Sequence, residues 1–245
     1  MAAVAADLPL LAAANPRAAL SRAASERGIT TASGRPLEFV AADDAPPGTA
    51  YEAHIAASGR VPTRLNAHDL LNALAWLAFP RSKARLNALQ SAAIARDGVG
   101  ARRGGLRDAA TLFDENGAIL ATEDPWVVQC LRERRWHALF VDGRARWDGV
   151  RVLAFGHALM EKLSLPYKAI TAHVLVVHRL ASTDGGVLDA EVANSLDENF
   201  GTTALLPLPV LGIPRWWAAN EDPAFYDDAL VFRPARAGSA GAPRG

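Results

Sequence analysis

The chain has 245 residues, of which 50% are hydrophobic and 21% are charged, so it is long enough to bury a sizeable core within one large domain. Its 26 basic residues balance its 26 acidic residues, and this neutrality offers no overall field that would draw the protein onto nucleic acid or an anionic membrane. The single cysteine, Cys130, excludes an intramolecular disulfide and a cysteine metal cluster, which suits a reducing compartment.

The first 50 residues are expected to form a lead-in that packs on the main body. They contain a short alanine-rich helix over residues 16–27. The apolar start of the chain has no basic residue before it, and Asp7 interrupts it, so a signal peptide is not expected. No apolar stretch reaches the roughly 20 residues that a membrane-spanning helix needs. We therefore expect a cytoplasmic protein without a membrane span.

The first strongly patterned element is a helix over residues 66–79. Asn66 stands where a helix N-cap belongs, and Asp69 follows three residues later, like the acidic member of a capping box. Ser82 is placed to cap a following helix over residues 83–96. The core-facing stripe of the first helix consists of leucines at helical spacing, namely Leu70, Leu71, Leu74 and Leu77.

A β-hairpin is predicted next, from two short apolar runs at residues 109–113 and 118–121. The residues between them end in Asn116 and Gly117, and an Asn-Gly pair supplies the positive φ angles that a tight hairpin turn requires. Three carboxylates flank this predicted hairpin: Asp108, Asp114 and Glu115.

The remaining segments change hydrophobic period several times, which is typical of an α+β protein. We expect helices over residues 125–134, 152–163 and 188–200, strands over 138–141 and 172–177, and an extended, proline-rich segment over 205–214. The predicted fold is a single α+β globular domain over residues 51–235 with a β-hairpin, a small mixed sheet and several packed helices. Residues 236–245 are rich in Gly, Ala and Pro and are expected to be a disordered tail.

Four sequence blocks carry a family resemblance. They are NAHDLLNALAWLAFP at 66–80, RDAATLFDENG at 107–117, FGHALMEKL at 155–163 with PYK at 166–168, and LPLPVLGIPRWW at 206–217. Together they resemble an uncharacterised bacterial family, a domain of unknown function found mainly in proteobacteria. The resemblance covers residues 51–234 and implies a bacterial single-domain protein. It implies no activity and no catalytic residue.

Two pairs of polar residues stand out at a spacing of four on predicted helices. His157 and Glu161 would lie on one helix face, where both could serve as metal ligands or as acid/base groups. His68 and Asn72 have the same spacing on the helix at 66–79, and we expect them to orient a bound group. The alternative is that His157 is a core histidine bonded to a backbone carbonyl and that Glu161 pairs with a neighbouring cation.

Other candidates complete the predicted site. His54 and His173 are further candidate metal ligands, and Arg107 is a candidate anion contact. Asp108 is a candidate catalytic carboxylate, although Arg107 and Asp108 also suit an intramolecular pair that anchors the hairpin. If histidines and carboxylates converge, they offer ligands for a divalent cation such as Zn²⁺ or Mn²⁺, which could activate water for hydrolysis.

Two functions from different classes remain open. The first is a metal-assisted hydrolase, with a phosphoester as its expected substrate. The second is a non-catalytic binding or scaffold protein, in which the same polar residues form a structural network. Trp216 and Trp217 would then meet a protein partner, although such an aromatic cluster more often clamps a C-terminal segment onto the core. The chain has no phosphate-binding glycine loop and no Gly-x-Ser-x-Gly nucleophile motif.

Overall fold

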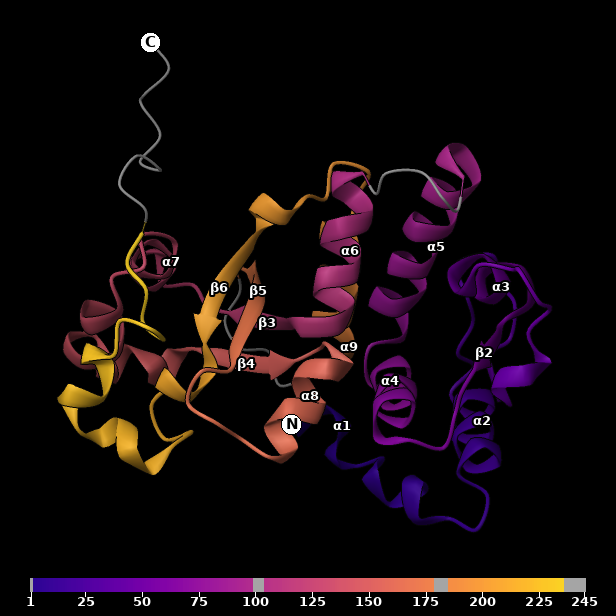
Figure 1. Cartoon of the computed structure of the whole chain (residues 1–245), viewed down its shortest axis with the longest axis horizontal. Coiled ribbons are helices and arrows are strands. Elements are labelled where there is room, and N and C mark those ends of the chain that lie inside the picture. Colours follow the sequence, from indigo (N-terminus) through magenta and orange to yellow (C-terminus); the bar gives the residue numbers. More distant parts are fainter. Residues whose placement is uncertain (1, 99–103, 179–184, 236–245) are drawn as a thin grey trace.

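The computed structural model describes residues 2–98, 104–178 and 185–235 (Figure 1). The helices are α1 (Ala2–Ala5), α2 (Pro16–Glu26), α3 (Tyr51–Ser58), α4 (Ala67–Ala78), α5 (Pro80–Asp97), α6 (Gly105–Asn116), α7 (Pro125–Arg132), α8 (His157–Ser164) and α9 (Gly185–Ser195). The strands are β1 (Glu38–Val40), β2 (Arg60–Pro62), β3 (Gly117–Ala121), β4 (Arg151–Ala154), β5 (Thr171–Val177) and β6 (Leu205–Pro209). The predicted α+β class is confirmed.

A mixed four-stranded sheet forms the centre of the fold, as the sequence predicts. Its strand order is β4-β3-β5-β6, with β3 and β5 parallel in the middle and an antiparallel strand on each side. Ile119 of β3 lies opposite Leu153 of β4 and Leu175 of β5. Strands β1 and β2 form a separate parallel pair.

The alternation of side chains along β3 divides the core into two clusters. Ala118 and Leu120 belong to the larger cluster, which also includes residues of α4, α7 and α8. Ile119 and Ala121 face the other side and pack with residues of α5, α6 and α9. Both faces of the sheet are therefore covered by helices, which explains why β3 is buried and apolar throughout and why β5 is apolar from Val174 to Val177, after Thr171 and His173 at its start.

The N-terminal lead-in contributes directly to the larger cluster. Val4, Leu20, Ile29 and Phe39 are buried there together with Leu74 of α4. The helix predicted over residues 16–27 is α2, and Asn15 caps it by accepting a hydrogen bond from the Ala18 amide. Residues 236–245, the predicted tail, lie outside the described part of the chain.

The predicted β-hairpin is wrong. Residues 105–116 form helix α6, and only the second run, β3, is a strand. Ala109, Ala110 and Phe113 are buried on one face of α6. Apolar residues at positions i, i+1 and i+4 share one face of a helix, so this short run fits a helix as well as a strand. Gly117 has a φ of −74°, so the Asn-Gly pair joins a helix to a strand and does not form a hairpin turn.

Two other expected elements also differ. Residues 138–142 form a π-helical turn that buries both Leu139 and Phe140, whereas a strand would direct these neighbours to opposite faces. The helix predicted over 152–163 is a strand, β4, followed by the shorter helix α8, because residues 151–154 pair with β3. The extended segment over 205–214 contains edge strand β6, where proline is tolerated.

The N-terminus of α4 is capped as predicted, but two details of the capping predictions are wrong. Asn66 accepts a hydrogen bond from the Asp69 amide. The Asp69 carboxylate does not reach back to Asn66 but accepts from the Arg64 amide at 2.8 Å. Ser82 lies inside α5 and is not its cap, because that helix already begins at Pro80. Among the described residues, no helix is both long enough and apolar enough to cross a bilayer.

Candidate metal centre

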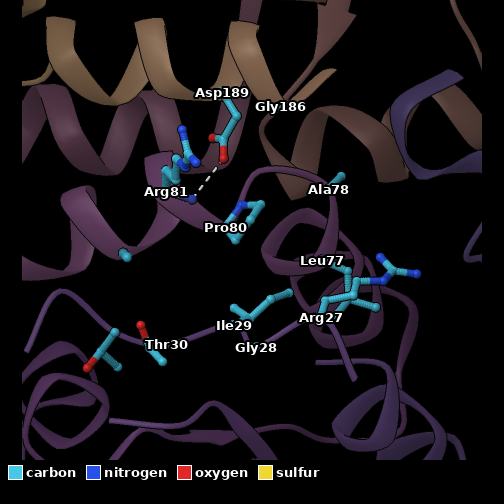
Figure 2. Close-up of a pocket in the computed structure, with 12 residues that line it drawn as sticks. Arg27, Gly28, Ile29, Thr30, Leu77, Ala78, Pro80, Arg81, Gly186 and Asp189 are labelled. Carbon is cyan, nitrogen blue, oxygen red and sulfur yellow. Dashed lines mark hydrogen bonds between the residues drawn. The ribbon is translucent and has the colours of Figure 1, made fainter. Parts of the chain in front are cut away.

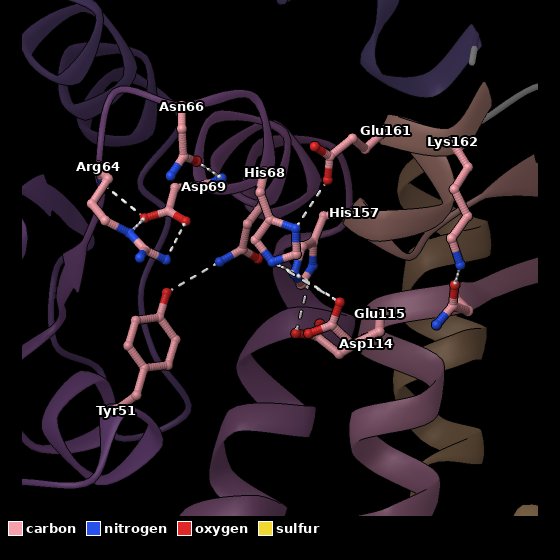
Figure 3. Close-up of polar contacts among 12 residues, drawn as sticks. Tyr51, Arg64, Asn66, His68, Asp69, Asp114, Glu115, His157, Glu161 and Lys162 are labelled. Carbon is pink, nitrogen blue, oxygen red and sulfur yellow. Dashed lines mark hydrogen bonds and ion pairs between the residues drawn. The ribbon is translucent and has the colours of Figure 1, made fainter. Parts of the chain in front are cut away.

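Three side chains from three helices meet where α4, α6 and α8 come together (Figure 3). The Nε2 atoms of His68 and His157 lie 3.0 Å apart. The Oε2 atom of Glu115 lies 3.5 Å from His157 Nε2 and 4.0 Å from His68 Nε2. Within the described part of the chain, this is the one group of His, Cys, Asp and Glu side chains that could share a metal ion.

The separations among these three atoms suit a first-row divalent cation. A point equidistant from the three atoms would lie about 2.1 Å from each, which is the length of a zinc–nitrogen or zinc–oxygen bond. Two imidazoles and one carboxylate also form a donor set that such cations prefer. The separations of the three atoms are therefore compatible with one shared ion.

Gly156 makes the approach of α8 to the end of α6 possible. A Cβ atom at this position would lie 2.3 Å from the backbone oxygen of Glu115 and 2.5 Å from the backbone nitrogen of Gly117. The Gly156 amide instead donates a hydrogen bond to the Gly117 oxygen at 2.8 Å. His157 is the next residue and the first of α8, so this close backbone contact places its ring beside Glu115.

The protonation state of His157 suits metal binding. Its side chain is buried, and burial lowers the pKa to about 4, although the nearby Asp114 carboxylate acts in the opposite direction. The ring is therefore neutral at physiological pH, which is the form that binds a metal. Burial also raises the pKa of Glu115, an effect that His68 opposes.

Further carboxylates lie behind the two imidazoles at unequal distances. Glu161 Oε2 lies 3.2 Å from His68 Nδ1, the nitrogen that faces away from the centre. Asp114 Oδ2 lies 3.9 Å from His157 Nδ1. A carboxylate hydrogen-bonded behind a ligating histidine fixes the ring orientation and increases its basicity, and the Glu161–His68 contact is of this kind. The Asp114–His157 separation is too long for a hydrogen bond, and His157 Nδ1 has no hydrogen-bond partner among the described residues.

A chain of buried polar groups extends from Asp114 into the wall of the site. Lys83, whose side chain is 4% exposed, forms an ion pair with Asp114 and donates to Asn72 Oδ1 at 2.7 Å. Asn72 Nδ2 then donates to the hydroxyl of Tyr51 at 3.1 Å. These residues come from α3, α4, α5 and α6, so the network joins four helices around the centre.

A cavity of about 350 Å³ opens directly beside the two histidines. Its lining includes His68 and His157 together with Tyr51, Arg64 and Asn72. Arg64 is held by Asp69, which accepts from its Nε at 3.0 Å and from its Nη2 at 3.1 Å. A small molecule in this cavity would therefore meet the centre on one side and hydrogen-bond donors on the other.

A larger cavity of about 560 Å³ lies elsewhere, between residues 27–31, the α4–α5 corner and α9 (Figure 2). Two of the charged groups in its wall, those of Arg27 and Asp189, are already engaged. Arg27 pairs with Asp7, and the Asp189 carboxylate accepts from the backbone amides of Arg81 and Ser82. Its wall brings no metal-ligating group of side chains together, so the smaller cavity is the better candidate for chemistry.

The structure brings together four of the sequence-predicted site residues and leaves four apart. His68, Asn72, His157 and Glu161 lie in or directly around the centre. Glu161 contacts His68 and does not join His157 in a shared pair of ligands.

The other four residues lie outside the group. His54 is buried in α3, and His173 lies on β5 opposite Pro207 of β6. Arg107 and Asp108 are in the first turn of α6, about 10 to 12 Å along the helix from Glu115 at about 1.5 Å per residue. None of the four belongs to the group of three ligands.

Several residues of the site were not identified as its members from the sequence. Glu115 was placed beside a hairpin, although a helical interpretation of residues 105–116 would have put it at a helix end. Lys83 and Tyr51 carry no local signal. The buried position of Lys83 in α5 becomes informative only once its partner Asp114 is known.

The two tryptophans near the C-terminus differ in environment. Trp217 packs partly against the larger core cluster, whereas Trp216 is 36% exposed. Trp217 therefore suits the expected role of holding the C-terminal segment on the core, whereas Trp216 lies at the surface.

Comparison with known proteins identifies a family. A family model described as a protein of unknown function, DUF3025, matches residues 37–236. No curated protein and no solved structure matches the chain. The matched region contains His68, Glu115 and His157 together with the whole four-stranded sheet. The chain belongs to the DUF3025 family.

Proposed function

We propose that the protein is a metal-assisted hydrolase whose divalent cation is held by His68, Glu115 and His157. The observation that carries the proposal is the spacing of the three ligand atoms, at 3.0, 3.5 and 4.0 Å, beside an open cavity. A site with three protein ligands leaves a coordination position free for water or substrate, as in catalytic zinc sites.

The residues around the centre suit hydrolytic chemistry. A bound divalent cation lowers the pKa of a coordinated water towards neutrality and so supplies hydroxide for attack. His157 is neutral and therefore able to bind the cation, and Glu161 lies within hydrogen-bond distance of His68 Nδ1. Lys83 and Asp114 form a buried ion pair that supports the wall next to His157.

We further propose a phosphoester as the substrate and the bacterial cytoplasm as the location. Arg64 and Tyr51 line the cavity and offer hydrogen-bond donors to an anionic group. Arg64 thus takes the anion-contact role that the sequence suggested for Arg107. The single, buried Cys130 suits a reducing compartment.

A second function follows from the same contacts. Since the His68 and His157 rings lie within hydrogen-bond distance of each other, and Glu161 lies within reach of His68, the polar residues can also form a closed structural network. In that case the protein is a binding or scaffold protein, and metal ions have no effect on it.

Metal analysis separates the two functions. We expect the wild-type protein, purified without chelator, to retain close to one zinc or manganese ion per chain and to hydrolyse p-nitrophenyl phosphate. The variant His68→Ala should lose the ion and the activity but keep its fold, because the His68 side chain is 38% exposed. The matched control is His137→Ala, because His137 is an exposed histidine outside the group of three ligands. Its ring lies 3.8 Å from Asp142.

The outcomes are distinct. A metal-free wild type whose melting temperature is unchanged by Zn²⁺, Mn²⁺ or Mg²⁺ would overturn the hydrolase and favour the scaffold. Stoichiometric iron with no hydrolysis would retain the centre but replace hydrolysis with redox chemistry, because two histidines and one carboxylate also bind non-haem iron.

A further inference from the structure

We propose that Tyr51 donates a hydrogen bond to a phosphoryl oxygen of the ligand in the cavity beside the centre, and that Lys83 and Asn72 position it to do so. This inference rests on the proposed function, since it assigns the group that would bind the substrate anion. It depends on the direction of each hydrogen bond in the chain Lys83–Asn72–Tyr51.

The direction begins at Lys83. An ammonium group has three donors and no acceptor, so Lys83 can only donate to Asn72. The atom of Asn72 that faces Lys83 at 2.7 Å must therefore be its carbonyl oxygen. This fixes the orientation of the whole amide group, which a side-chain amide otherwise leaves ambiguous.

The direction then passes to Tyr51. Because the Asn72 oxygen faces Lys83, its NH₂ group faces Tyr51 and donates to the hydroxyl oxygen at 3.1 Å. The phenolic oxygen is the acceptor in this contact, and its own proton is not used. Among the described residues, Asn72 is the hydrogen-bond partner of this hydroxyl, so the O–H is available to a molecule in the cavity that Tyr51 lines.

The surroundings keep that proton on the oxygen. Tyr51 as a whole is 41% exposed, but its hydroxyl lies largely among protein atoms where the cavity wall meets Asn72. This burial, followed by the carboxylates of Glu52 and Asp114, raises the pKa of Tyr51 well above its usual value. Hydrogen bonds that run in one direction from a buried cation also polarise one another, which strengthens the last donor.

The lining of the cavity indicates the class of ligand. Tyr51 and Arg64 present donors, and the centre itself would present a cation. The Asp69 carboxylate is occupied by Arg64 through two side-chain nitrogens and the backbone amide. A ligand that accepts hydrogen bonds and carries negative charge, such as phosphate or a phosphoester, matches this set.

Phosphate binding to the zinc-loaded protein tests the proposal. Inorganic phosphate is titrated calorimetrically into the wild type, Tyr51→Phe and the control Tyr167→Phe, after the zinc content of each has been measured. Tyr167 is an exposed tyrosine outside the cavity lining. We expect Tyr51→Phe to bind phosphate about 10-fold or more weakly, with unchanged zinc content and melting temperature, and the control to match the wild type.

A second variant tests the direction of the chain. In Asn72→Asp the side chain keeps the acceptor for Lys83 but replaces the donor with a second acceptor, so the Tyr51 proton turns towards residue 72 and away from the ligand. This variant should lose at least as much phosphate affinity as Tyr51→Phe, because its added charge in the cavity wall also repels the anion, and adding Tyr51→Phe to it should cause little further loss. A purely structural role for Asn72 would make the two losses additive.

Each outcome bears on one claim. Phosphate affinity of Tyr51→Phe within twofold of the wild type, with zinc still bound, would overturn the role of Tyr51 and leave the hydrolase intact. Zinc-loaded wild type that does not bind phosphate would overturn the ligand class. A wild type that binds no zinc would overturn the proposed function and this inference together.

Discussion

Glu52 carries a buried carboxyl group whose pKa lies well above that of an ordinary glutamate. Burial raises its pKa to about 7, and the Asp114 carboxylate adds to this effect, while the Asn87 amide and Lys83 reduce it. Its Oε2 atom accepts a hydrogen bond from Asn87 at 2.5 Å. Because the folded state holds this proton more tightly than the unfolded chain, the stabilising contribution is present at acidic pH. It is lost as the pH rises through about 7.

The variant Glu52→Gln should therefore change the pH dependence of stability. Glutamine keeps the acceptor for Asn87 and removes the ionisation. We expect its free energy of unfolding to be close to that of the wild type near pH 4 and greater by on the order of 3 kcal/mol near pH 8. Urea denaturation across this range measures the difference. Glu133→Gln, at a half-exposed position, serves as the control, and a constant offset between wild type and Glu52→Gln would refute the assignment.

Gly156 determines how closely two ligands approach. The variant Gly156→Ala places a Cβ atom 2.3 Å from the Glu115 backbone oxygen, so α8 must move away from α6. We expect a loss of about 1 to 3 kcal/mol in stability and at least a tenfold weaker affinity for zinc, measured by competition with a chromophoric chelator. Gly149→Ala is the matched control, because a Cβ atom there meets nothing within 4 Å. Unchanged zinc affinity in Gly156→Ala would show that the centre does not depend on this contact.

Part of the site could be predicted from single residues. The spacing of four on predicted helices identified His157 and Glu161 as candidate ligands and His68 as an orienting residue, whereas in the structure His68 belongs to the group of ligands and Glu161 contacts it. The sequence places Glu115 only among three carboxylates that could converge with the histidines, and the hairpin prediction for its neighbourhood gave no reason to prefer it. Tyr51 is an aromatic residue on a short helix, and nothing local distinguishes it from one that packs in a core.

At the scale of elements, a side chain of α9 caps the N-terminus of α5, although the two helices are far apart in the sequence. The Asp189 carboxylate accepts from the amides of Arg81 at 2.8 Å and Ser82 at 2.9 Å, and from the Ser82 hydroxyl at 2.6 Å. The first turn of a helix leaves amides without partners and carries a partial positive charge, so a buried carboxylate there is stabilising. Phe79, which precedes α5, provides no side-chain cap of its own.

Removal of this contact should weaken the junction of the two helices. We expect Asp189→Ala to lower the free energy of unfolding by about 2 to 4 kcal/mol, because it leaves buried amides unsatisfied. Asp148→Ala, which breaks an exposed ion pair with Arg215, should cost less than about 1 kcal/mol. Denaturant unfolding of both variants gives the comparison, and equal losses would contradict the capping role of Asp189.

Elements were predictable where their signals were local. The caps at Asn66 and Asp124 lie next to the helices they begin, and both helices are found where expected. Asn116-Gly117 misled because the same dipeptide can end a helix, and the difference depends on contacts of Phe113 with distant residues. Strand β4 was merged with α8 because its pairing with β3 is not visible in its own periodicity.

At the scale of the whole molecule, the sequence predicted the fold class but not the convergence of the site. His68 and His157 are 89 positions apart, and they meet because α4 and α8 pack on the same side of the sheet. The parallel pairing of β3 with β5 has this effect, because the chain must return to the same end of the sheet before β5 begins. The connecting segment contains β4 and α8, so it places α8 next to the sheet. Hydrophobic periodicity reports the inward face of each element and not which faces meet.

The prolines of β6 limit how far the sheet can grow. Pro207 and Pro209 lie on an outer strand, and neither has an amide hydrogen, so the ladder to β5 depends on the residues between them. The outer edge of β6 thus presents carbonyl oxygens but no backbone N–H donor at Pro207 and Pro209. An arriving strand from another copy of the chain would find half of its backbone partners missing there, and this protects the protein against edge-to-edge aggregation during and after folding.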